Sequence, residues 1–191
     1  MVGIHHFIIK PIGERYENEK TIGEKKLIVN SEVSNHEYVS RRAIVVSCPR
    51  VNDTDIKQGD EIIVHHNVFR RWYDVKGLEK NSKAYFKDDL YLVDIGQIFL
   101  FKENNSWKST PGFSFVQPIK SDATIDVGES EDPYKGIITH TDGNTKVGDL
   151  VGYTPFSKYE FVIDGKRIYR VYNKFITIKY EYQGDEEEYN P

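Results

Sequence analysis

The strongest constraint on the fold of this chain is a repeat: five apolar segments recur in the same order in its two halves. The pairs are 8–12 with 115–119, 43–46 with 136–139, 57–63 with 146–152, 90–93 with 168–171, and Ile98 with Ile176. A single match between two short apolar runs is common. All of these matches in one order predict a tandem duplication of one structural unit.

The repeated segments have the character of β-strands. They are short apolar runs separated by turn signals, and no window of three turns has the spacing and capping of an amphipathic helix. The chain contains 13 Tyr and 10 Phe, which, like Ile and Val, favour pleated and half-buried surfaces. The sequence therefore predicts an all-β fold, with a barrel or a sandwich in each half.

The repeat also predicts the domain organisation. A first domain is expected at 1–102 and a second at 107–183, joined by the polar linker 103–106. The acidic tail, 184–191, is expected to be solvated.

The first half contains an insertion, 67–85, that has no counterpart in the second half. It holds the run Phe69-Arg70-Arg71-Trp72-Tyr73. Neighbouring Arg and Trp side chains suit single-stranded nucleic acid, but the net charge of −4 disfavours a nucleic-acid partner. We expect these aromatic side chains to pack at a subunit interface, with an Arg against a neighbour's carboxylate.

The order of the matched segments resembles the GroES-like co-chaperonins, the ten-kilodalton chaperonin family. The segment 146–151 is similar to the family's Val-Gly-Asp turn and strand, and 159–171, with Asp164-Gly165 at its centre, is similar to its closing hairpin. The resemblance covers nearly the whole chain, as two copies in place of the usual one. It implies two tandem GroES-like, partly open β-barrels.

A long polar segment, 13–42, separates the first predicted strand from the next and contains the apolar triplet Leu27-Ile28-Val29. The segment is too polar to pack as core and too long for an ordinary connection. In the family, a mobile loop at this place docks an apolar tripeptide into a groove of the chaperonin. The resemblance therefore implies that Leu27, Ile28 and Val29 bind a chaperonin. The alternative is that the triplet is one more strand of the first barrel.

The second half lacks a clear counterpart of this motif. Its corresponding segment is shorter, and Ile125 and Val127 are separated and have acidic neighbours. Neither half has the long Gly-rich excursion that forms the family's roof hairpin. We expect the second half to be architectural, without its own chaperonin contact.

Other function classes lack support in the sequence. Cys48 is the only cysteine, and the adjacent histidines at 5–6 and 65–66 point to opposite faces of a strand, so neither a disulfide nor a metal site is expected. The fingerprints of nucleophilic, phosphate-binding and dinucleotide sites are absent, so we expect no enzyme and no cofactor. No apolar run approaches the roughly 20 residues that span a bilayer, which predicts a cytoplasmic protein without a membrane partner.

The resemblance implies a function: a homo-oligomeric ring that caps a GroEL-like chaperonin and assists ATP-dependent protein folding. The unfolded protein substrate would be contacted only indirectly. Edge pairing of terminal strands such as 175–180 is expected to join the subunits. The composition, rich in Lys, Asn, Ile and Tyr, suits a bacteriophage source and hence the host cytoplasm. The alternatives are a viral structural or assembly protein that reuses the barrel, and a ligand-binding β module with a closed apolar pocket.

Overall fold

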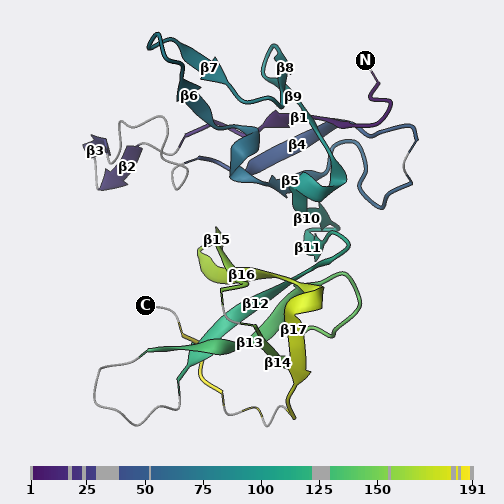
Figure 1. Cartoon of the computed structure of the whole chain (residues 1–191), viewed down its shortest axis with the longest axis vertical. Helices are drawn as coiled ribbons and strands as arrows, with labels where there is room; N and C mark the ends of the chain where they lie inside the picture. Colours follow the sequence, from purple (N-terminus) through teal and green to yellow (C-terminus); the bar gives the residue numbers. More distant parts are fainter. Residues whose placement is uncertain are drawn as a thin grey trace. The chain divides into compact units, whose positions relative to one another are not determined.

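The computed structural model (Figure 1) describes residues 2–16, 19–22, 25–28, 39–51, 53–121, 130–154, 156–181, 184 and 186–189, with the backbone alone for 19–22 and 25–28. Within these residues there is no α-helix, and the few helical segments are single 3-10 turns between strands. The prediction of an all-β fold is confirmed. The chain divides into two compact units, Met1–Ser106 and Trp107–Pro191.

The first unit is built on one antiparallel sheet with two small hairpins beside it. The sheet contains β1 (Phe7–Pro11), β4 (Arg42–Ser47), β5 (Glu61–Val64), β8 (Tyr85–Lys87), β9 (Leu90–Val93) and β10 (Ile98–Glu103), followed at one edge by β11 (Ser106–Ser109). The hairpins are β2 (Glu19–Ile22) with β3 (Lys25–Ile28), and β6 (Arg71–Tyr73) with β7 (Glu79–Asn81), and each is a sheet of its own. The 3-10 turns are η2 (His66–Val68) and η3 (Ile95–Gln97).

The described strands of the second unit after β11 form a single antiparallel sheet. Its strands are β12 (Phe113–Lys120), β13 (Glu131–Thr141), β14 (Leu150–Tyr153), β15 (Tyr159–Ile163), β16 (Lys166–Tyr172) and β17 (Ile176–Lys179), with the 3-10 turn η4 (Asn173–Phe175) before the last strand.

The two sheets have the same topology. The order β10-β5-β4-β1-β9-β8 in the first unit corresponds strand for strand to β17-β14-β13-β12-β16-β15 in the second. In both units the last strand directly follows a 3-10 turn. The segments paired by the sequence repeat therefore occupy equivalent strands.

The strand registers correspond as well. Ile9 lies opposite Val45, and Val116 lies opposite Ile138, each directly after a β-bulge in the first strand of its unit. These are the positions that the sequence repeat aligns. A slip of one residue would send every side chain to the other face, so both units turn the same positions inward.

The equivalent positions form the two cores. Buried residues are paired between the units as follows: Ile9 with Val116, Val45 with Ile138, Ile62 with Val151, Val64 with Tyr153, Tyr91 with Tyr169, and Val93 with Val171. The first core is larger, and it adds residues from η2 and from the insertion, Val68 and Phe69.

The Gly-Asp turns at 57–60 and 146–149 are built alike. Gly59 and Gly148 have φ angles of +93° and +91°, in the region where a side chain is strained. In each turn the Asp carboxylate accepts a hydrogen bond from the backbone amide of the Lys three residues earlier, at 2.7 Å in the first and 3.0 Å in the second. Both turns thus lead directly into β5 or β14.

The hairpins that close each unit use the same turn geometry. Asp164 and Gly165, between β15 and β16, have φ angles of +50° and +78°. Asp88 and Asp89, between β8 and β9, have φ angles of +49° and +58°. Two consecutive positive φ angles define the turn that best matches the twist of a two-residue hairpin.

The sheets are not closed barrels. In each unit the described strands form a linear order with two edges, and no described pairing joins the edges. The coarse prediction of β-rich units is met, whereas barrel closure is not observed.

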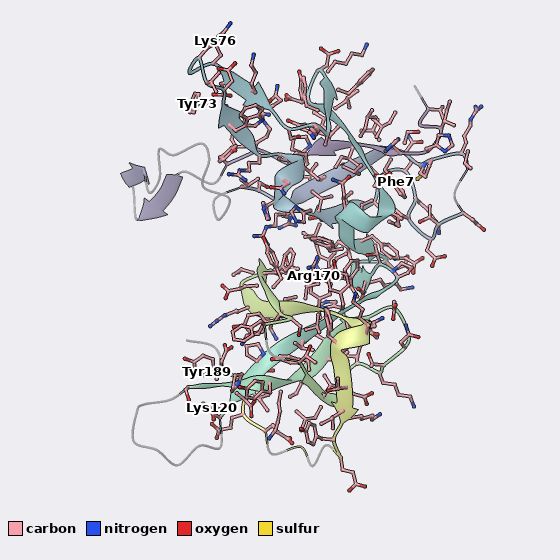
Figure 2. All side chains as sticks on the ribbon, viewed as in Figure 1. Phe7, Tyr73, Lys76, Lys120, Arg170 and Tyr189 are labelled. Atoms are coloured by element: carbon pink, nitrogen blue, oxygen red, sulfur yellow. The ribbon has the colours of Figure 1, made fainter. Side chains whose placement is uncertain are left out.

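The predicted linker and the described part of the acidic tail both have defined backbone conformations. The predicted linker, 103–106, is the turn between β10 and β11, with Asn104 and Asn105 at φ angles of +50° and +63°. In the acidic tail, the Glu187 carbonyl accepts a hydrogen bond from the Lys120 amide at 2.9 Å. The two side chains also form an ion pair at 2.7 Å. Figure 2 labels Lys120 and, in the tail, Tyr189. The side chain of Glu187 is exposed, and its backbone is paired with the end of β12.

Candidate functional site

The triplet predicted to bind a chaperonin lies in and just beyond the β2–β3 hairpin. Leu27 and Ile28 belong to β3, where their backbone pairs with Lys20 and Glu19 of β2. Val29 lies outside the described residues. Among the described strands, β2 and β3 pair with each other and not with the seven-stranded sheet.

The chain leaves the first core before β2 and returns to the same place before β4. We call this place the stem, and it consists of Arg15, Tyr16, Val39 and Ser40. Tyr16 and Val39 form an antiparallel bridge, and both side chains are buried in the first core. The amide of Ser40 donates to the carbonyl of Arg15 at 2.9 Å. The two ends of the segment 17–38 are therefore held together by packed core residues.

Arg15 connects the stem to two other strands. Its Nη1 donates to the hydroxyl of Tyr91 in β9 and to the side-chain oxygen of Asn81 in β7, both at 2.7 Å. Burial raises the pKa of the Tyr91 hydroxyl, and the nearby Arg15 charge opposes that rise. At neutral pH the hydroxyl is protonated and accepts from Arg15.

Tyr16 connects the stem to the insertion. Its hydroxyl accepts a hydrogen bond from the backbone amide of Arg71 at 2.6 Å. The guanidinium of Arg71 also lies 4.8 Å from the centroid of the Tyr16 ring, in cation–π contact. Together, Arg15 and Tyr16 attach both strands of the β6–β7 hairpin to the stem.

The insertion differs from the sequence expectation at Phe69. Phe69 is fully buried in the first unit's own core, where its ring packs edge-on against Tyr91 at 4.8 Å. Arg71 forms an ion pair within the hairpin, with Glu79 at 2.8 Å. Both residues therefore serve the fold of this unit.

The tip of the β6–β7 hairpin is ordered by Asp74. Its carboxylate accepts hydrogen bonds from the backbone amides of Lys76 and Leu78, both at 2.9 Å. The Leu78 bond, followed by the Lys76 bond and the charge of Lys80, lowers the pKa of Asp74. The turn thus has a fixed conformation although it is exposed.

Apolar side chains are exposed along this hairpin. The exposed fractions are 48% for Trp72, 55% for Tyr73, 104% for Val75 and 55% for Leu78. Figure 2 shows Tyr73 and Lys76 on the hairpin. Sequence reasoning identified the aromatic run but assigned none of its residues to the site, because nothing local connects the run with the stem.

The second unit has a polar cluster at the place that corresponds to the stem of the first unit, close in the chain to residues 122–129. The carboxylate of Glu131 accepts from the hydroxyl of Tyr169 at 2.6 Å, forms an ion pair with Arg167 at 3.3 Å and also pairs with Lys158. Burial by itself raises the pKa of Glu131, but the hydrogen bonds and charges of these partners outweigh it and lower the pKa. Ile125 and Val127, the weak counterparts of the triplet, lie outside the described residues.

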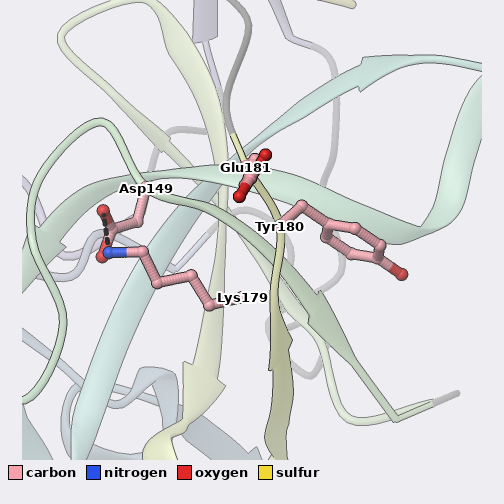
Figure 3. A pocket seen from close by; sticks show the side chains of 4 residues that line it. All are labelled: Asp149, Lys179, Tyr180 and Glu181. Atoms are coloured by element: carbon pink, nitrogen blue, oxygen red, sulfur yellow. Dashed lines mark ion pairs between the residues drawn. The ribbon is translucent and has the colours of Figure 1, made fainter.

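A surface hollow in the second unit is lined by Asp149, Lys179, Tyr180 and Glu181 (Figure 3). The ammonium of Lys179 forms a hydrogen-bonded ion pair with the carboxylate of Asp149 at 2.8 Å. This bond, followed by the hydrogen bond from the Lys146 amide, lowers the pKa of Asp149. The pair joins the Gly-Asp turn to β17, which is a structural role.

No metal centre is formed by the residues that the structure describes: no group of three or more His, Cys, Asp or Glu side chains converges on a point. The Nε2 of His6 lies 3.3 Å from the Oδ1 of Asp94. The Nδ1 of His65 accepts a hydrogen bond from the backbone amide of Asn67 at 3.1 Å. In the same described part of the chain, no helix has the length and apolar character that a transmembrane helix requires.

No family model matches this chain, and no curated protein matches it.

Proposed function

We propose that this protein is a co-chaperonin of two GroES-like units that assembles into a ring and caps the cavity of a GroEL-like chaperonin. The observation that carries the proposal is the succession of elements shared by both units. Each has an opening strand, an excursion, a second strand, a Gly-Asp turn with its strand, a closing hairpin and a last strand. This is the succession on which the resemblance to the GroES-like family rests.

The proposed docking element is the triplet Leu27-Ile28-Val29. Two observations support this role: β3 lies in a hairpin that is separate from the seven-stranded sheet, and the segment starts and ends at a buried stem. A hairpin that is not part of the main sheet can contact a partner without disturbing the core. The triplet would dock into an apolar groove of the chaperonin.

The energetics favour many weak contacts. Burying three aliphatic side chains contributes at most roughly 1.5–3 kcal/mol each, and ordering the segment on binding offsets much of this. A ring that presents several copies to a matching ring gains affinity through effective concentration. A nucleotide-driven change in the partner could then release all copies together. The proposal assigns no catalytic residue or cofactor to this chain.

The direct test is capture of the protein by a purified GroEL-type chaperonin in ADP or ATP. We expect the wild type to be retained, and Leu27→Asp and Ile28→Asp to reduce retention at least about tenfold, because each places a charge in an apolar groove at every copy. Val147→Asp is the matched control, since Val147 is 67% exposed on the second unit's Gly-Asp turn. Retention of both aspartate variants at the wild-type level would show that the triplet is not the docking element.

Limited proteolysis separates this function from a viral structural role. A co-chaperonin should be protected from cleavage within 23–35 when chaperonin and nucleotide are added. A virion component should show the same cleavage with and without chaperonin.

A further inference from the structure

The β6–β7 hairpin is not part of the strand order that the two units share. The second unit has the same strand order and register, and it connects β14 to β15 through the five residues 154–158. The first unit places a whole hairpin at this point, between β5 and β8. A feature that one copy of the fold lacks requires another explanation.

The hairpin exposes apolar surface on a rigid support. Trp72, Tyr73, Val75 and Leu78 are each about half to fully exposed, while the hairpin's backbone is held by Asp74 at the tip. Trp72 and Tyr73 are adjacent in β6 and so lie on opposite faces of the hairpin, while Val75 and Leu78 flank its tip. Several exposed apolar side chains on one hairpin are typical of interaction sites. Aromatic residues of this kind also dominate binding energy at interfaces.

The hairpin is attached to the stem of the proposed docking segment. Arg15 and Tyr16 stand at the point where that segment leaves the core. The Tyr16 hydroxyl accepts a hydrogen bond from the Arg71 amide of β6 at 2.6 Å, and the Arg15 guanidinium donates one to the side-chain oxygen of Asn81 in β7 at 2.7 Å. A partner that captures the segment therefore approaches the side of the unit that carries the hairpin.

The charge of the insertion specifies the partner's chemistry. Residues 67–85 contain five Lys or Arg and two Asp or Glu, although the whole chain has a net charge of −4. The two acids are paired within the hairpin, Glu79 with Arg71 at 2.8 Å and Asp74 with Lys80 at 3.6 Å. The hairpin thus carries exposed apolar side chains together with an excess of positive charge, and its complement is an apolar face that carries acidic groups.

We propose that the β6–β7 hairpin is a second docking surface for the same chaperonin, which receives an apolar face that carries acidic groups, beside the groove that takes the triplet. This inference rests on the proposed function and adds a rigid contact to it. A preformed contact loses little entropy on binding, and so it complements a segment that must be ordered.

The test uses the full chain and a purified GroEL-type chaperonin with ADP. We expect the double variant Val75→Asp/Lys76→Glu to bind at least about tenfold more weakly, because it reverses charge at the exposed tip of every copy in the ring. The matched control is Phe156→Asp, since Phe156 is 103% exposed in the corresponding connection of the second unit; it should bind within about twofold of the wild type. As a second measurement, amides 71–81 of the wild type should exchange more slowly with solvent in the complex.

The outcomes distinguish this inference from the proposed function. If the wild type binds and Ile28→Asp does not, while the hairpin variant binds like the wild type and its amides are unprotected, the inference is wrong and the function stands. If the wild type does not bind, the proposed function and this inference both fail. Sedimentation velocity of the free proteins is the last measurement. If the hairpin variant forms a smaller oligomer than the wild type, the hairpin binds a second copy of this chain and not the chaperonin, and the inference is overturned.

Discussion

At the scale of single residues, the first unit depends on side chains that join distant parts of the chain. Tyr16 buries its ring in the core and accepts the Arg71 amide through its hydroxyl, and Arg15 bonds both Asn81 and Tyr91. Tyr169 of the second unit is the equivalent of Tyr91. Its hydroxyl donates a hydrogen bond to the carboxylate of Glu131, which closely follows residues 122–129 in the chain. In both units, therefore, a buried tyrosine of the strand before the last, β9 or β16, forms a hydrogen bond through its hydroxyl. Its partner is a residue close in the chain to the segment that follows the first strand, Arg15 in the first unit and Glu131 in the second.

Tyr16→Phe should destabilise the first unit by about 1 kcal/mol, because the Arg71 amide loses its acceptor while the ring packing is kept. Urea unfolding followed by far-UV circular dichroism would measure the change. Tyr134→Phe, at a tyrosine that is 52% exposed, should leave stability within about 0.5 kcal/mol of the wild type. Equal stability of both variants and the wild type would mean that the Arg71 amide is satisfied by water.

Glu131 should make the second unit sensitive to acid. Its pKa in the folded state lies below the ordinary value of 4.5, so its stabilising effect is present above that value and is lost as pH falls through the folded pKa. Glu131→Gln should reduce stability at neutral pH and lose less on acidification than the wild type does. The measurement is the urea midpoint at about pH 7 and about pH 3.5.

The control for this pH effect is Glu160→Gln, because Glu160 also pairs with Arg167, at 3.1 Å, but is more exposed. It should follow the wild type at both pH values. An acid sensitivity of Glu131→Gln as large as that of the wild type would contradict the role of this carboxylate.

At the scale of elements, the turns are the best-defined local features. The Gly-Asp turns before β5 and β14 share the glycine φ and the Asp-to-amide bond, and the closing hairpins share two consecutive positive φ angles. Such turns set the strand registers, and the registers set which side chains enter the core. The β6–β7 hairpin adds an element to this frame without altering it.

Gly59→Ala and Gly148→Ala should each cost about 1 kcal/mol or more, because alanine is strained at a φ near +90°. Open space surrounds both positions, so the cost arises from the backbone and not from a clash. Gly96→Ala is the matched control, since the space around Gly96 is also open but its φ is not positive. Thermal unfolding of the three variants measures the effect. Similar losses at Gly96 and Gly148 would show that backbone strain is not the cause.

At the scale of the whole molecule, the chain is two copies of one topology with different additions. Each copy has its own core, and the six-stranded sheet of the second copy, β12 to β17, lies entirely within Trp107–Pro191, with the tail paired to β12. The hairpins β2–β3 and β6–β7 belong to the first unit alone among the described elements. The proposed division of labour follows: the first unit contacts the partner, and the second extends the ring.

The second unit should therefore fold on its own. We expect a fragment of residues 107–191 to give a dispersed amide NMR spectrum and a cooperative thermal transition, because its six-stranded sheet and its core need no residue of the first unit. The fragment should not be retained by a chaperonin. An unfolded fragment would show that its sheet is stable only within the intact chain.

The amino-acid sequence predicts the duplication, the all-β class, the strands that the repeat pairs and the two kinds of turn, because the signal of each lies in residues close together in the chain. It also identified the triplet Leu27–Val29 as a binding element by resemblance, which stays a prediction. The folded structure was needed to show that Phe69 is core, that Arg71 pairs with Glu79 in its own hairpin, and that the hairpin is attached to the stem. The physical reason is distance along the chain: the bonds from Tyr16 to Arg71 and from Arg15 to Tyr91 span 55 and 76 residues, and such contacts exist only after the strands between them have packed.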